Sequence, residues 1–122
     1  MESGAITDAQ LTASSEYELG DKNNVHVAMA MYGRLHFREN GSIAGAWVAN
    51  TSDYHQWLQV DLGDQYAKVT GLSTQGRNSS TYPQWVTKYK LQYSGNGGPF
   101  KFYREHGRTT DKVKLTQSPR TR

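Results

Sequence analysis

The stretch from Gln56 to Gly63 (QWLQVDLG) most constrains the fold, because its side chains alternate in character along the chain. Leu58, Val60 and Leu62 share one side of an extended chain, and Trp57 and polar residues share the other. A period of two is typical of a β-strand with two different faces. The glycine and the aspartate that follow the leucine supply a turn. The stretch is too short for an amphipathic helix, so it predicts a central β-strand.

Other short segments predict further strands around this one. They are a first strand within residues 6–15, strands over 66–75 and 86–94, and a strand over 100–103 that completes a hairpin after the Gly-rich turn 95–99. Asn-Gly within residues 39–42 predicts a tight turn. The sequence of residues 25–35 is compatible with a helical turn or a strand. Many short strands separated by turn residues, with no convincing helix, predict an all-β sandwich or jelly roll.

The composition is that of one domain with an aromatic-rich core. The 122 residues are only 35% hydrophobic, but they include 3 Trp, 8 Tyr and 3 Phe, whose large side chains suffice for a thin β-sandwich core. Trp47, Trp57 and Trp85 lie in or beside predicted strands, so we expect them in that core. No apolar stretch has the length of a membrane-spanning helix.

Charge is distributed unevenly along the chain. Residues 1–98 hold seven Lys and Arg against nine Asp and Glu, whereas residues 99–122 hold seven against two. The net charge of +3 is therefore a property of the C-terminal segment. A basic segment of this kind is most often a solvated end, and the alternative is attachment to an anionic polymer or membrane.

Catalytic and metal motifs are not found in the sequence. The four histidines His26, His36, His55 and His106 lack zincin spacing, and the chain has no cysteine for a structural zinc site. The glycines around Ser42 do not have nucleophile-elbow spacing, and the carboxylates are scattered. These observations predict a protein that is not an enzyme.

Several segments in the same order resemble the discoidin family, also called the F5/8 type C domain. They are the N-terminal residues 6–17, Gly45–Trp47, the central octad, and residues 69–77 and 84–94. The resemblance implies a distorted jelly-roll β-sandwich or barrel, galactose-binding domain-like. For residues 25–35 it favours a loop followed by an edge strand. It covers residues 1–103 and leaves 104–122 as a basic, non-matching tail, in which Val113 and Leu115 can make one short edge strand.

The tail leads us to expect that the last strands of the domain are missing and that apolar surface is exposed. Members of the family usually carry a disulfide between cysteines near the two ends of the domain. This chain has no cysteine, and we expect the two cysteines of such a bridge to lie beyond its limits. We therefore expect the chain to be part of a longer extracellular or secreted product, although its N-terminus has no signal-peptide pattern.

The resemblance implies that ligands meet three loops at one end of the barrel. On this chain the loops are about residues 18–27, 36–43 and 77–83, and their candidate ligand-binding residues are His26, Val27, Phe37, Arg38, Arg77 and Tyr82. An apolar or aromatic tip beside cations suits a membrane interface or a sugar ring. The alternative for Val25, Val27 and Phe37 is that they are core residues of adjoining strands.

The resemblance thus implies a non-catalytic extracellular adhesion or recognition module. Its partner is a carbohydrate, an anionic phospholipid or a protein at the cell surface, with no nucleic acid. The alternative is an incomplete discoidin fragment with no independent binding activity. The lack of Trp in the loops and the slightly acidic domain body argue against phosphatidylserine.

The sequence also contains candidate glycosylation sites and candidate calcium ligands. Three N-x-Ser/Thr sequons, at Asn40, Asn50 and Asn78, are glycosylation candidates in predicted loops. No cofactor is expected except a calcium ion, which some family members hold in a loop. Its oxygen donors here would be Asp21, Asn23 and Asn24, or Asp53, and neither set has many carboxylates.

Overall fold

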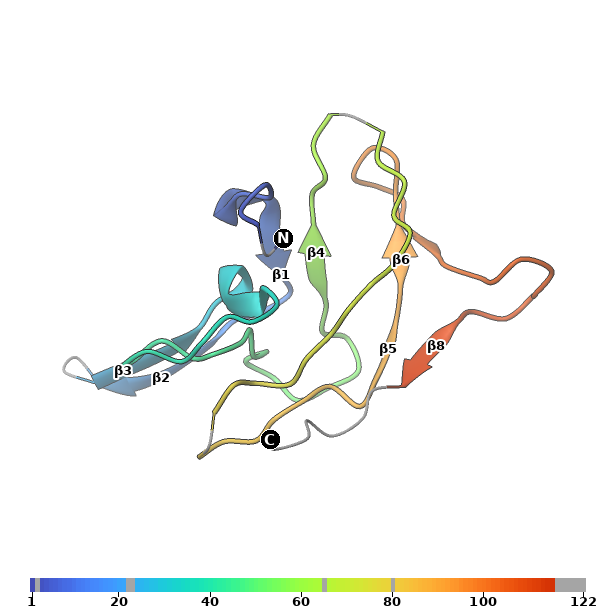
Figure 1. Ribbon diagram of the computed structural model, residues 1–122. Coiled ribbons are helices and arrows are strands. Elements are labelled where there is room, and N and C mark those ends of the chain that lie inside the picture. The colour runs from blue at the N-terminus through green and yellow to red at the C-terminus, as the bar shows by residue number, and fades with distance from the viewer. Residues whose placement is uncertain (2, 22–23, 65, 80, 116–122) are drawn as a thin grey trace. The chain divides into compact units, whose positions relative to one another are not determined.

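A computed structural model describes residues 1, 3–21, 24–64, 66–79 and 81–115 (Figure 1). For residues 19–21, 24–26 and 115 the description covers the backbone alone. The chain divides into two compact units, residues 1–84 and 85–122, which are considered separately. The regular structure consists of short β-strands and two 3₁₀ turns, so the predicted all-β class is confirmed. Within the described chain, neither turn is long or apolar enough to span a bilayer.

The predicted central strand is present in the first unit as β4, Leu58–Val60. It pairs antiparallel with β1, Leu11–Ala13, so that Leu11 lies opposite Val60 and Ala13 opposite Leu58. A 3₁₀ turn η1, Asp8–Gln10, precedes β1. The Gln10 side-chain amide donates to the Asp61 carbonyl at 2.8 Å, which extends the connection beyond the three paired residues.

A β-hairpin follows and projects from the rest of the first unit (Figure 1). Its strands are β2, Tyr17–Asp21, and β3, Asn24–Ala28, paired from Tyr17 opposite Ala28 to Asp21 opposite Asn24. The 3₁₀ turn η2, Ala30–Gly33, comes next, and its first amide donates to the Glu16 carboxylate at 2.6 Å. Residues 25–35 therefore contain a strand followed by a helical turn, instead of the loop followed by an edge strand that we expected.

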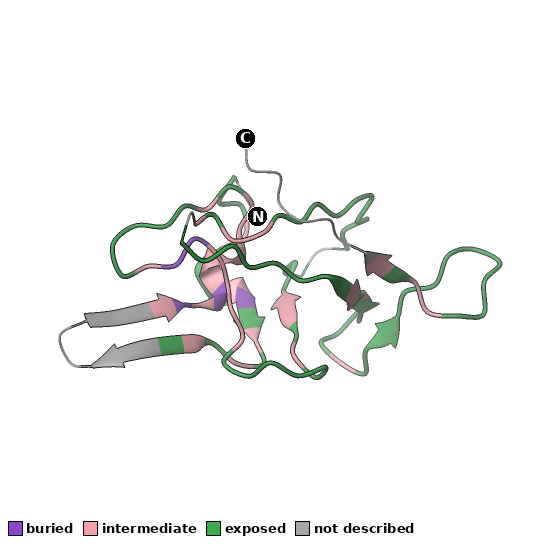
Figure 2. Cartoon of the chain, turned by 90° about the horizontal axis from the view of Figure 1, so that it is seen from below, coloured by how far each residue is buried: buried purple, intermediate pink, exposed green. Residues whose placement is uncertain are grey.

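The buried core of the first unit is small. Leu11, Ala28, Ala30 and Ala44 are the buried apolar residues of the described chain. Figure 2 shows these positions gathered where β1, the base of the hairpin and η2 meet. Three of the four are alanines, so Leu11 has the largest apolar side chain among them.

The expectation that all three tryptophans are core residues is wrong. Trp47 is half-buried, and its indole N–H donates to the Ser15 carbonyl at 2.9 Å. Trp57 is 49% exposed and Trp85 is 39% exposed. Trp57 precedes Leu58 in the chain and therefore lies on the opposite face of β4. A strand buries only the face that another element covers.

The predicted strand over residues 66–75 is also wrong. Residues 66–75 form no strand, and Tyr66, Val69 and Leu72 are more than half exposed. Their composition favours an extended chain, but a ladder also needs a neighbouring strand that takes its backbone hydrogen bonds. The described segment forms no such ladder, and its apolar side chains are exposed, in line with the exposed apolar surface that we expected.

The second unit contains two short antiparallel pairs. Strand β5, Lys88–Lys90, pairs with β8, Val113–Leu115, and β6, Gln92–Tyr93, pairs with β7, Lys101–Phe102. The predicted hairpin around the Gly-rich turn and the predicted short strand at Val113 and Leu115 are thus confirmed. The strand predicted over 86–94 is interrupted at Leu91, because the partner changes there from β8 to β7.

Candidate functional site

The second predicted loop, residues 36–43, ends in a tight turn. The Asn40 amide donates to the Ile43 carbonyl at 3.0 Å, and the Ile43 amide donates back to Asn40 at 3.0 Å. Gly41 adopts φ 58°, a left-handed conformation that favours glycine. The Asn-Gly prediction is therefore confirmed, and the turn exposes the short polar side chains of Asn40 and Ser42.

This loop is fixed to the base of the β2–β3 hairpin, which forms the first predicted loop. The Val27 amide donates to the Ser42 carbonyl at 3.0 Å, and the Ala44 amide donates to the Val27 carbonyl at 2.9 Å. The Val48 amide donates to the Ala28 carbonyl at 3.2 Å. These backbone bonds make the hairpin base and the second loop one connected structure.

The third predicted loop is closed by bonds between its two ends. The Arg77 amide donates to the Gln84 carbonyl at 2.8 Å, and the Arg77 guanidinium donates to the Gln84 side chain at 2.9 Å. Inside the loop, the Ser79 hydroxyl accepts the Tyr82 amide at 3.2 Å. The guanidinium carbon of Arg77 lies 5.0 Å from the centre of the Tyr82 ring, a cation–π contact.

Gly45 is the point where the second and third loops meet. A Cβ at this buried position would stand 2.6 Å from the Asn78 carbonyl oxygen and 2.9 Å from the Glu39 backbone nitrogen. Both atoms belong to backbone, which cannot rotate away as a side chain does. The missing side chain therefore lets the two loops approach each other. We call residues 36–43 and 77–84 together the loop surface.

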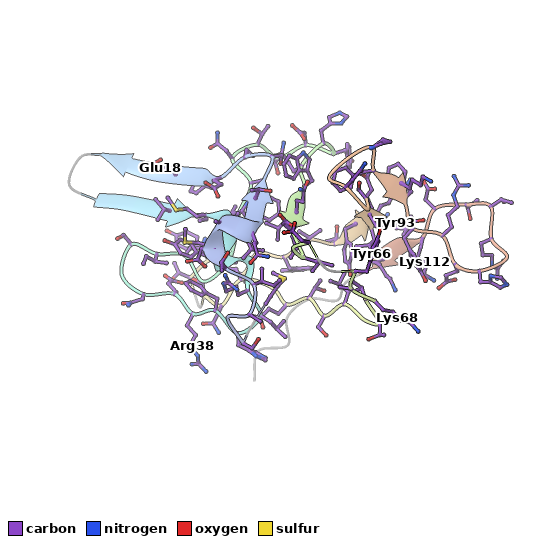
Figure 3. The ribbon with its side chains drawn as sticks, turned by 90° about the horizontal axis from the view of Figure 1, so that it is seen from above. Glu18, Arg38, Tyr66, Lys68, Tyr93 and Lys112 are labelled. Atoms are coloured by element: carbon purple, nitrogen blue, oxygen red, sulfur yellow. The ribbon has the colours of Figure 1, made fainter. Side chains whose placement is uncertain are left out.

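The predicted site residues differ in what they present to solvent. Arg38 and Tyr82 are exposed, and Figure 3 shows the Arg38 side chain pointing away from the ribbon. Phe37 is half-buried and stacks on Tyr32, with ring centres 4.9 Å apart and planes 15° apart. Val27 is half-buried beside the second loop. The loop surface therefore presents Arg38 and Tyr82, while Phe37 packs below it.

Arg77 and His26 are the remaining predicted ligand-binding residues. Arg77 is half-buried, and its Nε is a buried donor with no hydrogen-bond partner among the described residues. The side chain of His26 lies outside the described part of the structure. The sequon residues Asn40, Asn50 and Asn78 are all exposed. Asn40 and Asn78 belong to the loop surface itself.

Gly45 and Gln84 were missed by sequence reasoning. Gly45 lies between Ala44 and Ala46, and a run of three small residues was the available signal of a close backbone approach. Gln84 holds Arg77 through both its backbone and its side chain, and nothing in its local sequence indicates that pairing.

Of the candidate calcium donors, only Asp53 has a described side chain. The Asp53 carboxylate accepts the Gln56 side-chain amide at 3.0 Å and the His55 backbone amide at 2.8 Å, and these bonds lower its pKa. Asn23 lies outside the described residues, as do the side chains of Asp21 and Asn24. Among the residues described, no three His, Asp or Glu side chains form a group that could hold a metal ion.

The second unit has a separate cluster of ion pairs. Asp111 accepts from Arg104 Nε at 3.1 Å and from Lys90 Nζ at 3.2 Å, and Glu105 pairs with Lys112 at 2.7 Å. The hydrogen bond from Arg104, followed by the bond and charge of Lys90, lowers the pKa of Asp111. The hydrogen bond and charge of Lys112 lower the pKa of Glu105, with weaker contributions from Lys114 and Arg108.

The lowered pKa of Asp111 predicts where this cluster responds to pH. A carboxyl whose folded pKa is depressed stabilises the fold above its unfolded pKa of about 4, and that contribution is lost as pH falls through the folded value. We expect the Asp111 carboxyl to titrate below the same aspartate in a short unstructured peptide, as measured by ¹³C NMR of the carboxyl carbon. Asp111→Asn identifies the signal. A midpoint at or above that of the peptide would contradict the ion pairs.

Comparison with known proteins agrees with this architecture. The F5/8 type C domain family matches residues 10–121. Rat (Rattus norvegicus) lactadherin is 37% identical over 113 residues, covering 93% of this chain and 25% of lactadherin. Rat discoidin, CUB and LCCL domain-containing protein 2 is 38% identical over 117 residues, covering 93% of this chain and 14% of that protein.

A third relative is coagulation factor V of Sus scrofa, which is 35% identical over 116 residues, covering 93% of this chain and 5% of factor V. The chain thus spans about a quarter or less of each of these three relatives. The family match includes the basic segment from residue 104 up to residue 121. The fold of this family is a jelly-roll β-sandwich, and the all-β structure of the chain is consistent with it. The chain belongs to the F5/8 type C, or discoidin, domain family.

Proposed function

We propose that this domain is a non-catalytic recognition module that binds a cell-surface ligand through its loop surface. The observation that carries the proposal is the approach of the second and third loops at Gly45. It makes one continuous surface from segments far apart in the sequence. A binding site of this kind needs side chains held in place before the ligand arrives, because ordering them on binding costs free energy.

The chemistry of the loop surface favours a glycan. Tyr82 is 54% exposed and has Arg77 over one face of its ring, which leaves the rest of the ring for a sugar. Arg38 supplies exposed hydrogen-bond donors. Asn40 and Ser42 at the tight turn are short and polar, whereas insertion into a membrane needs bulky apolar tips. A glycan therefore suits the described loops better than a bilayer does.

We place the module outside the cell. The three sequons all have exposed asparagines, as oligosaccharide attachment in the secretory pathway requires. Glycans on Asn40 or Asn78 would cover the loop surface, so the proposal further requires these two positions to be free of glycan in the binding-competent protein.

The test compares substitutions on the loop surface with matched substitutions elsewhere in the first unit. Arg38→Gln and Tyr82→Ala remove the two exposed side chains. Lys68→Gln and Tyr66→Ala remove an exposed cation and an exposed ring from the segment after β4, which lies away from Arg38 in Figure 3. Each variant is tested on a glycan array, and a hit is confirmed by competition with the free sugar.

We expect Arg38→Gln and Tyr82→Ala to weaken glycan binding by about tenfold each, as is usual for side chains at the centre of a site. The two control variants should bind like the wild type. Co-sedimentation with phosphatidylserine vesicles, lost in the same two variants, would move the ligand to lipid. If the wild type binds neither, the alternative of a domain without independent binding activity is favoured.

A further inference from the structure

The second unit carries a strong excess of positive charge. Residues 85–122 hold nine Lys and Arg against two carboxylates, whereas residues 1–84 hold five against nine. The two units therefore have net charges of opposite sign. Concentrated charge of one sign attracts partners of the other sign from solution. The proposed loop surface lies in the first unit and does not use this charge.

The two carboxylates of the second unit gather its cations. Asp111 holds Lys90 from β5 and Arg104 from the segment after β7, and Glu105 holds Lys112 from the segment before β8. Arg108 and Lys114 act on Glu105 through their charges. We call the five cations Lys90, Arg104, Arg108, Lys112 and Lys114 the basic cluster. Five cations share two carboxylates, so the cluster keeps a net positive charge after its internal pairs are made.

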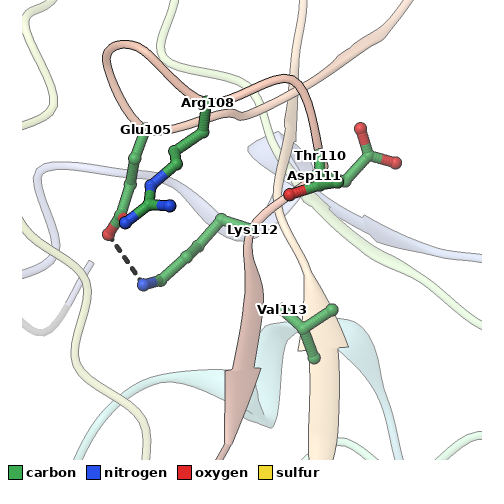
Figure 4. A pocket seen from close by; sticks show the side chains of 6 residues that line it. All are labelled: Glu105, Arg108, Thr110, Asp111, Lys112 and Val113. Carbon is green, nitrogen blue, oxygen red and sulfur yellow. Dashed lines mark ion pairs between the residues drawn. The ribbon is translucent and has the colours of Figure 1, made fainter.

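An open pocket lies within the basic cluster. It has a volume of about 310 Å³, and Glu105, Arg108, Thr110, Asp111, Lys112 and Val113 line it (Figure 4). Figure 4 shows the Arg108 guanidinium and the Lys112 ammonium beside the Glu105 carboxylate. Together with the Thr110 hydroxyl they are hydrogen-bond donors, and a sulfate group has oxygens that accept from all three kinds of group.

We propose that the basic cluster binds a sulfated linear polysaccharide. The cations come from three separate segments, so a ligand with several anionic groups can contact more of them than one small anion can. One cation of the pocket is recessed, since the side chain of Lys112 is 35% exposed. The sulfates that branch from a flexible polymer reach into such a pocket, whereas the head groups of a flat bilayer meet only protruding side chains.

The test uses the full chain and a heparin octasaccharide as the probe. Arg108→Gln/Lys112→Gln removes two cations from the pocket. The control Lys68→Gln/Lys101→Gln removes the same charge from exposed positions. Lys101 neighbours Phe102, over whose ring Lys90 lies at 5.1 Å, so strand alternation puts Lys101 on the face opposite the cluster. Unchanged circular dichroism and thermal melts show that both variants fold like the wild type.

We expect the pocket variant to bind the octasaccharide about tenfold more weakly than the wild type, with a shallower dependence on salt, because two charge-assisted contacts are lost. The control should lose little affinity, and a fully desulfated octasaccharide should not bind. An equal loss in both variants would overturn the proposal, since it would mean attraction by net charge alone. Binding of phosphatidylserine vesicles without octasaccharide binding would overturn it in favour of a membrane.

The test of the basic cluster is independent of the loop-surface proposal. Arg38→Gln and Tyr82→Ala should leave octasaccharide affinity unchanged if the basic cluster is the site. Loss of octasaccharide binding in those variants, with retention in the pocket variant, would assign the sulfated polymer to the loop surface and contradict the cluster.

Discussion

Replacing Gly45 by alanine is expected to lower the free energy of unfolding by about 1–3 kcal/mol and to weaken ligand binding by the loop surface. The new Cβ would stand 2.6 Å from the Asn78 carbonyl oxygen and 2.9 Å from the Glu39 nitrogen, closer than Cβ atoms approach non-bonded atoms in proteins. One loop must therefore move. Urea unfolding followed by circular dichroism measures the stability, and the glycan assay measures the binding.

Gly71→Ala is the matched control. A Cβ at Gly71 meets no atom within 4 Å, and its backbone does not adopt a positive φ. Alanine there should leave stability unchanged or raise it slightly, because it restricts the unfolded chain. If Gly45→Ala is as stable as Gly71→Ala and binds ligand like the wild type, the two loops do not depend on contact at Gly45.

Leu11→Ala is expected to have the largest effect on stability, about 2–5 kcal/mol. Leu11 is 5% exposed, and the other buried apolar residues of the described chain are alanines. Removing its side chain leaves a cavity where β1, η2 and the base of the hairpin meet. Since small domains are stable by only about 5–15 kcal/mol, this substitution removes a large share of the total.

Leu62→Ala is the control for that substitution. Leu62 is 45% exposed and lies just beyond the paired residues of β4. It should cost much less than Leu11→Ala in urea unfolding. Hydrogen exchange at the Ser14 amide, which donates to the Trp57 carbonyl at 3.0 Å, reports on the β1–β4 pair directly. Equal costs for the two leucine variants would show that the core lies elsewhere.

The sequence predicted those elements that a local residue pattern indicates. The turn at Asn40–Ile43 and the hairpin of β6 and β7 follow from turn residues beside short extended segments. The central strand β4 follows from alternation, although only three of its eight residues are paired. In each case the residues of the turn or strand themselves indicate its conformation.

Other features depend on neighbours that are distant in the sequence. Residues 66–75 have the composition of a strand, yet they form no ladder in the described structure, because composition does not supply the partner that a strand needs. Trp57 and Trp85 are exposed because no element covers their faces in the described chain, which aromatic character alone does not reveal. For a strand, local propensity specifies the conformation, and the partner specifies pairing and burial.

The candidate site likewise combines features that the sequence indicates with features that depend on distant residues. The three loops and the exposed residues Arg38 and Tyr82 could be located from the family resemblance and from composition. The stacking of Phe37 on Tyr32 and the hydrogen bonds between Gln84 and Arg77 could not be predicted. Aromatic rings, amides and guanidinium groups each pair with many kinds of side chain, so the sequence does not identify the partner. The contact at Gly45 brings Asn78 to residues more than 30 positions earlier in the chain, and only the three-dimensional structure reveals it.

The most direct test of the loop surface is NMR mapping of a bound glycan. Backbone amide shifts are followed while the glycan that scores best on the array is titrated into the ¹⁵N-labelled chain. The account predicts that the perturbed amides gather in residues 36–43 and 77–84 together, and that residues around Tyr54 and Tyr66 do not move. Perturbation of only one of the two loops, or of the exposed segment 66–75 instead, would contradict a single surface joined at Gly45.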